Sequence, residues 1–146
     1  MSGLMNEDIE GQLSKECLYW QDKLYLRDWT VGVKLCRHWD MSPNAVGETM
    51  MYPERKEAQV KLLHPEDIPG VEEHFLNDEA RDYDITLVHE LLHLHFQPLG
   101  ITDESKAEGV AQEVAINQIS RALVRLRREA HCKPEPPAEP TYGNYL

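Results

Sequence analysis

The segment His-Glu-Leu-Leu-His at residues 89–93 constrains this chain more than any other feature. Apolar residues surround it at helical spacing, which predicts a helix over residues 77–97. On a helix, residues four positions apart lie one turn apart on the same face, so His89 and His93 can reach one metal ion together. Glu90 is rotated by about 100° from that line, so it need not bind the ion and can hold a water molecule instead.

This pattern suits the hydrolysis of a peptide bond with the help of zinc. A zinc ion lowers the pKa of a water molecule, and a nearby carboxylate accepts the proton as the water attacks a carbonyl. We therefore expect His89 and His93 to bind one Zn²⁺ ion and Glu90 to act as the general base. A chance match in a chain of this composition has a probability on the order of a few per cent. The apolar surroundings lower it further, since buried histidines need polar partners.

A catalytic zinc site needs a third protein ligand, which we expect from the helix that follows. His95 points to another helix face and cannot join His93. The acidic candidates further along are Asp103, Glu104, Glu108 and Glu113. Glu113 is preferred because it lies well inside the helix among apolar residues, where an unpaired carboxylate is costly, and Glu108 is the runner-up. Asn117 lies one turn further on the same face and is expected to bond the outer nitrogen of a ligand histidine.

The rest of the chain predicts a single α+β domain. An apolar stripe predicts an N-terminal helix over residues 8–27. Alternating apolar and polar residues with short connections predict a small, mainly antiparallel sheet of three strands, at residues 29–39, 45–52 and 58–63. The glutamate helix is predicted from residues 102–103 to about 131, with an inward apolar set of Val110, Val114, Ile116, Ile119, Leu123 and Leu126. The domain then covers residues 1–131, and the proline-rich residues 132–146 form a C-terminal tail.

Charge and cysteine content limit the expected partners and compartment. The chain carries 15 basic and 26 acidic residues, and its net charge of −11 disfavours a nucleic-acid partner. No segment has the pattern of a signal peptide or the roughly 18 apolar residues of a membrane span, so no membrane partner is expected. Three cysteines without a CxxC pair favour free thiols in a reducing compartment, which indicates the cytoplasm.

The two helical motifs together resemble those of gluzincin metallopeptidases, which combine His-Glu-x-x-His with a glutamate on a following helix. Glu113 stands 20 residues after His93 (113 − 93), as in thermolysin-like members, and Glu113-x-x-x-Asn117 is similar to their Glu-x-x-x-Asp pattern. The asparagine resembles that of the repressor-cleaving peptidases of mobile elements, although Ile116 stands where those carry alanine. The small size is similar to that of minigluzincins and of short metallopeptidases encoded by phages and prophages.

This resemblance extends over about residues 29–126 and implies a zinc endopeptidase with a peptide or protein substrate. For a phage or prophage protein it implies the host cytoplasm. It also implies that an edge strand beside the active-site helix holds the substrate by strand addition, and residues 57–63 are expected to be that strand. Larger members stabilise the oxyanion with a tyrosine or histidine. The candidates for that role here are Tyr142, Tyr145, His131, His74 and His64.

Other functions stay open on the sequence alone. One is a zinc-containing peptide-binding or regulatory domain with little or no turnover, autoinhibited by its tail. Glu90 argues for the peptidase, because a structural zinc site needs no general base and usually includes cysteine. Another is a toxin or anti-repressor that acts by binding a partner, for which only the mobile-element resemblance speaks. Neither the cleavage specificity nor the oligomeric state follows from the sequence.

Overall fold

The computed structural model describes residues 2–71 and 82–132, which form an α+β fold and confirm the predicted class. The main elements are α1 (Ser2–Lys23), β1 (Thr30–Cys36), β2 (Gly47–Tyr52), β3 (Glu57–Leu63), α2 (Tyr83–Phe96) and α3 (Ala107–Cys132). Short 3-10 helices are η1 (His38–Asp40), η2 (Pro65–Gly70) and η4 (Gln97–Leu99). Residues 77–81 of the predicted helix and residues 133–146 of the predicted tail lie outside the described residues.

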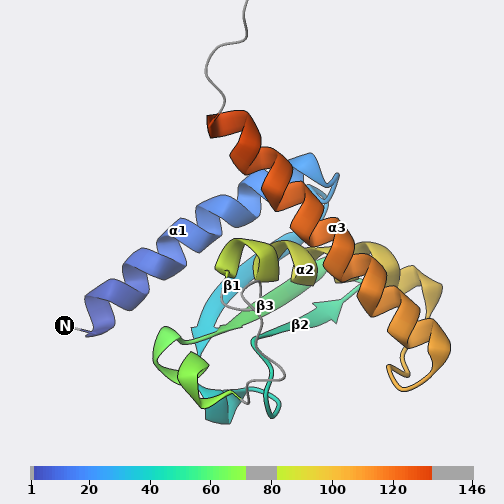
Figure 1. Ribbon diagram of the computed structural model, residues 1–146, viewed down its shortest axis with the longest axis horizontal. Coiled ribbons are helices and arrows are strands. Elements are labelled where there is room, and N and C mark those ends of the chain that lie inside the picture. The colour runs from blue at the N-terminus through green and yellow to red at the C-terminus, as the bar shows by residue number, and fades with distance from the viewer. Residues whose placement is uncertain (1, 72–81, 133–146) are drawn as a thin grey trace, which may run out of the picture.

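The sheet has the strand order β1-β3-β2 (Figure 1). β1 pairs with β3 in parallel and β2 pairs with β3 antiparallel, so the sheet is mixed. The expected meander is therefore wrong in its first pair, because β1 does not pair with β2. The short turn at residues 53–56 makes a hairpin of β2 and β3, whereas the longer stretch 37–46 lets the chain cross to the far side. The buried side chains of Ala58, Val60 and Leu62 suit β3 to the centre.

The strand at residues 57–63 cannot add a substrate strand, which corrects the expectation for it. Both edges of β3 are already paired, and the free edges of the sheet belong to β1 and β2. On β1, the Leu35 N–H donates to Glu10 Oε1 of α1 at 2.9 Å, so α1 occupies part of that edge. Within the described residues no strand pairs with the outer edge of β2. Among the described strands, β2 is thus the one whose outer edge is open.

Helix α2 is the centre of the packing. It lies over one face of the sheet, and α1 and α3 both contact it (Figure 1). Its leucines and valine join the sheet and α1 in one core that includes Trp20, Trp29, Val60, Leu62, Leu87, Val88, Leu91 and Ile116. The other sheet face carries Lys34, Met50 and Tyr52 toward solvent. Among the described helices, none combines the length and the apolar character needed to cross a membrane.

Helix α3 buries a narrower face than the sequence predicts. Ile116 and Val124 are buried against the core, whereas Val110 and Val114 are each 52% exposed and Leu126 is 61% exposed. The helix packs mainly along α2, so these three side chains on its flanks lie away from the described core. Ile119 is also exposed, at 39%. The expectation that Val110, Val114, Ile119 and Leu126 face inward is therefore wrong.

Two arginines hold the second half of α3 in place. Arg127 pairs with Glu16 of α1, and its guanidinium lies 3.6 Å from the centroid of the Tyr19 ring. Arg128 donates to Asp82 at 2.7 Å and to Asp84 at 3.1 Å, next to the first turn of α2. These contacts connect α3 to α1 and to the start of α2.

The start of α3 needs a residue without a side chain at position 109. A Cβ atom on Gly109 would lie 2.3 Å from the Asp103 carbonyl oxygen and 2.7 Å from Glu104 Cα. We expect Gly109→Ala to lower the free energy of unfolding by about 1–3 kcal/mol, measured by urea denaturation, because backbone atoms must move. Gly11→Ala is the matched control, since nothing lies within 4 Å there, and it should be neutral or stabilise α1 by up to about 1 kcal/mol. Equal stability of the two variants would contradict the steric account.

Candidate metal centre

Two histidines of α2 and one glutamate of α3 converge at the helix crossing. His89 Nε2 and His93 Nε2 lie 3.3 Å apart. Glu113 Oε2 lies 3.3 Å from His89 Nε2, and Glu113 Oε1 lies 3.1 Å from His93 Nε2. All three side chains are half-buried, and their potential ligand atoms lie within 4.8 Å of one another. Among the described residues, no other group of three or more His, Cys, Asp and Glu side chains lies close enough together to hold a metal ion.

The spacing of these three groups fits a tetrahedral zinc site. Zinc binds histidine nitrogen and carboxylate oxygen at about 2.0–2.2 Å, so neighbouring ligand atoms of a tetrahedron lie roughly 3.3 Å apart. Here the two histidine nitrogens lie 3.3 Å apart, each lies 3.1 to 3.3 Å from a different oxygen of Glu113, and one ligand atom from each residue lies within 4.8 Å of the others. Two imidazoles and one carboxylate are also a donor set of catalytic zinc sites, which keep a fourth position open. The residues present therefore fit such an ion.

The charges of the three groups are complementary. Hydrogen bonds to His89 and His93 hold the pKa of Glu113 below its ordinary value. Burial acts to lower the pKa of His89, but Glu113, the nearby Glu90 carboxylate and a hydrogen bond to Asn117 together raise it. Because metal ligands must be deprotonated, a cation can replace the proton that these groups share.

Glu90 lies beside the cluster without joining it. Its residue is 6% exposed, and burial raises the pKa of the carboxyl group above its ordinary value. Thr49 on β2 donates from Oγ1 to Glu90 Oε1 at 2.8 Å, while Glu90 Oε2 lies 3.8 Å from His89 Nε2. One oxygen is thus held by the sheet, and the other is directed toward the histidines.

The close approach of β2 to Glu90 depends on Gly47. A Cβ atom there would lie 2.7 Å from Thr86 Cγ2 and 3.0 Å from Glu90 Oε2. With hydrogen in place of a side chain, β2 packs directly on this part of α2. Neither Gly47 nor Thr49 is expected from the sequence, because their role comes from a strand that pairs beside α2 and not from any local motif.

A hollow of about 450 Å³ opens over the cluster. Its lining consists of Ser42, Gly47, Glu48, Thr49, Met51, His89, Glu90, His93, Glu104 and Glu113. β2 thus forms one wall and the two helices form the other. No lysine or arginine is among these lining residues, so the hollow is acidic.

Of the other expected site residues, Asn117 and Glu104 lie near the cluster, and the rest lie away from it. Asn117 lies beside His89 and bonds to it, as a supporting residue should. Glu104 lines the hollow but does not belong to the three-residue cluster, and Asp103 instead accepts from Ser105. Glu108, the alternative ligand, is exposed and also outside the cluster. His95 Nε2 lies 2.5 Å from the carbonyl oxygen of Leu24, on another side of α2.

The candidates for oxyanion stabilisation do not meet the cluster. His64 is buried, and its Nδ1 accepts from the Glu66 N–H at 3.1 Å. His131 is exposed near the end of α3. Neither lines the hollow. His74, Tyr142 and Tyr145 lie outside the described residues.

Comparisons with known proteins do not identify this chain. A scan against family models finds no matching family, and searches of curated proteins and of solved structures find no match. Any assignment of function therefore depends on the geometry of the residues described above.

Proposed function

We propose that this protein is a zinc-dependent peptidase, with one Zn²⁺ ion held by His89, His93 and Glu113. One observation carries the proposal. The buried carboxylate of Glu90 lies beside the three converging groups, with one oxygen bonded to Thr49 and the other free to face the hollow. A site that only stabilised the fold would have no use for a buried carboxylate that is not a ligand.

In this proposal, Glu90, Thr49 and Asn117 would each have a separate role in the hydrolysis. When bound, zinc would polarise a substrate carbonyl and acidify a water molecule. Glu90 Oε2 would accept a proton from that water during attack and deliver it to the leaving amine. The hydrogen bond from Thr49 would hold the Glu90 carboxylate in position, and Asn117 would orient the His89 ring.

A peptide in extended conformation is the substrate that suits the wall formed by β2. The Leu63 N–H donates to the Val46 carbonyl at 2.9 Å, so Val46 and every second residue after it bond to β3. The N–H and C=O groups of Gly47, Thr49 and Met51 then point outward along the open edge, next to Glu90. An added strand there would bring its backbone past the proposed zinc.

Removal of the metal provides the direct test. We expect the purified protein to contain about one equivalent of zinc per chain, measured by mass spectrometry of the metal. Dialysis against a chelator should abolish the cleavage of a quenched fluorescent peptide library, and one equivalent of Zn²⁺ should restore it. Mg²⁺ at the same concentration is the control, because it prefers octahedral oxygen ligands. Cleavage that survives complete loss of the metal would disprove the proposal.

The composition of the lining favours a second candidate function, namely a zinc-containing domain that binds peptides but cleaves them slowly. Among the described residues of the hollow there is no tyrosine, arginine or third histidine that could stabilise an oxyanion. The same experiment separates the two functions. Zinc-dependent peptide binding without zinc-dependent cleavage would select the binding domain.

The bond between Thr49 and Glu90 predicts a specific pH dependence. This bond stabilises the charged carboxylate and so lowers the pKa of Glu90, opposing the effect of burial. Thr49→Val should therefore raise the pKa of Glu90 and move the acidic limb of the kcat/KM profile to higher pH. Thr30→Val, at an exposed position of β1, is the matched control and should leave the limb in place. A limb that moves to lower pH in Thr49→Val would contradict the assignment of Glu90 as base.

A further inference from the structure

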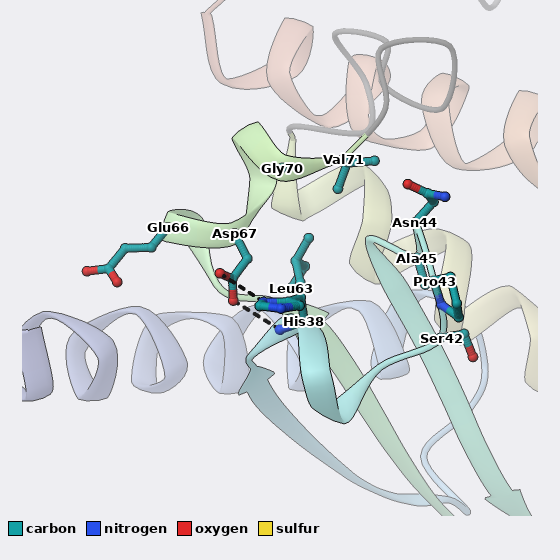
Figure 2. Close-up of a pocket in the computed structure, with 10 residues that line it drawn as sticks. All are labelled: His38, Ser42, Pro43, Asn44, Ala45, Leu63, Glu66, Asp67, Gly70 and Val71. Atoms are coloured by element: carbon teal, nitrogen blue, oxygen red, sulfur yellow. Dashed lines mark hydrogen bonds and ion pairs between the residues drawn. The ribbon is translucent and has the colours of Figure 1, made fainter.

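A second hollow, of about 310 Å³, lies next to the one over the metal ligands. We refer to it as the Leu63 pocket, and its lining includes His38, Pro43, Ala45, Leu63, Asp67 and Val71. Figure 2 shows the stretch that leads into β2 on one side of this pocket, with Leu63 and Val71 opposite. Its volume is at the lower end of small-ligand sites and is enough for one large side chain.

The polar side of the Leu63 pocket is already neutralised. Arg37 donates to Asp67 from Nε at 2.7 Å and from Nη2 at 3.1 Å. The His38 N–H also donates to Asp67, at 3.0 Å, and His38 Nδ1 lies 3.4 Å from the same carboxylate (Figure 2). These bonds join η2 to the turn at η1, so the pocket is preformed. Because Arg37 already balances its charge, the Asp67 carboxylate does not require a bound cation.

Much of the remaining wall is apolar, although Ser42 and Asn44 also line it and Glu66 lies at its edge with its side chain pointing away (Figure 2). Leu63 and Val71 are buried, and Pro43 and Ala45 face them across the pocket. An uncharged, apolar group gives up no hydrogen bonds to water on entering such a space and gains the burial of its apolar surface. A carboxylate would lose its hydration and would meet a pocket whose lining already includes the acidic residues Asp67 and Glu66.

The Leu63 pocket and the hollow of the metal ligands are adjacent. Ser42 lines both, and Ala45 lies two residues before the start of β2. Thr49, the residue bonded to Glu90, lies four residues after Ala45. At roughly 3.3 Å per residue this is about 13 Å along the chain. A peptide on the open edge of β2 therefore passes from Glu90 to the Leu63 pocket within about four of its own residues.

We infer that the Leu63 pocket binds a large apolar side chain of the peptide on β2, about four residues from the cleaved bond. The inference rests on the proposed function. It adds a requirement for the substrate, namely an apolar residue at a fixed distance from the scissile bond. Peptides too short to reach the pocket should be poorer substrates than longer ones.

The first test measures binding and needs no hydrolysis. The probe is N-acetyl-phenylalanine amide, titrated into the full-length protein carrying Glu90→Gln and followed by ¹H–¹⁵N NMR. We expect saturable shifts at the amides of Ala45, Leu63 and Val71, and none with N-acetyl-aspartate amide. Ala45→Trp should fill the pocket and abolish the shifts, and Pro43→Trp at the exposed rim is a second obstructing variant. Ala122→Trp, on the exposed side of α3, is the matched control.

The second test measures specificity with a library of decapeptides and mass spectrometry of the products. Wild type and Ala122→Trp should select Leu, Met or Phe three to five residues to one side of the cleaved bond, by at least about tenfold. Ala45→Trp and Pro43→Trp should lose this selection. No shift at the pocket, or selection unchanged in both obstructing variants, would overturn the inference. If no library peptide is cleaved, the proposed function fails, and the NMR titration still decides whether the pocket takes an apolar side chain.

Discussion

Glu90→Gln is expected to hydrolyse peptides about 10²- to 10⁴-fold more slowly than the wild type, which is the contribution of a general base. The variant protein should keep its zinc. Glutamine has the same size and can still accept the hydrogen bond from Thr49, so the position of the side chain should change little. It cannot accept a proton from water. Because Glu90 does not belong to the group of potential ligands, metal content should stay near one equivalent per chain.

The matched control for this variant is Glu108→Gln, which makes the same change at an exposed position in the first turn of α3. It should leave both hydrolysis and zinc content unchanged. The free energy of unfolding provides a further check, because Glu90 carries a buried carboxylate that is costly to ionise. Glu90→Gln should therefore be at least as stable as the wild type. Full hydrolysis by Glu90→Gln would exclude Glu90 as the base, and loss of zinc would make it a ligand.

Glu113→Ala is expected to have the largest effect on metal binding. Removal of a group that supports a ligand costs about 10- to 100-fold in metal affinity, so the removal of a ligand itself should cost more than about 100-fold. Asn117→Ala, which removes the partner of His89, should fall within the smaller range. Competition with a fluorescent zinc chelator measures both variants on one scale.

Two results would change the ligand assignment. Glu108 is the other glutamate that the sequence proposes, and Glu108→Ala is therefore the informative control. It should bind zinc as the wild type does, because Glu108 is exposed and lies outside the cluster. Full zinc occupancy in Glu113→Ala would remove Glu113 from the site. Weak binding by Glu108→Ala would instead require α3 to be rotated from the position described here.

The parts of the site that lie on helices could be predicted from the sequence. The spacing of His89 and His93 fixes their common face on any helix. Glu113 could be singled out as a carboxylate among apolar residues, although of its neighbours Val110, Val114 and Ile116 only Ile116 is buried. The structure brings these three side chains together. The strands begin and end within three residues of their predicted bounds. The helix bounds are less accurate, because α1 spans residues 2–23 where 8–27 was expected, and α3 begins at Ala107 where residues 102–103 were expected.

The parts that depend on strand order could not be predicted. The alternating pattern of residues 57–63 is the same for a central and an edge strand, so the position of β3 between two partners has no local signature. The contributions of Gly47 and Thr49 follow from that order, since only an outer β2 reaches Glu90. In the same way, the apolar residues of α3 do not indicate how few elements pack around it.

The open edge of β2 has a cost as well as a use. Unpaired N–H and C=O groups accept any extended chain, including the same edge of a second copy, which is how edge strands start aggregation. Here the hollow beside the edge is acidic, and the whole chain carries a net charge of −11. Two copies that approach each other near neutral pH are therefore repelled before their strands can pair. High salt or mild acid should weaken this protection, so the conditions in which the protein is concentrated and stored will decide whether its edge stays available.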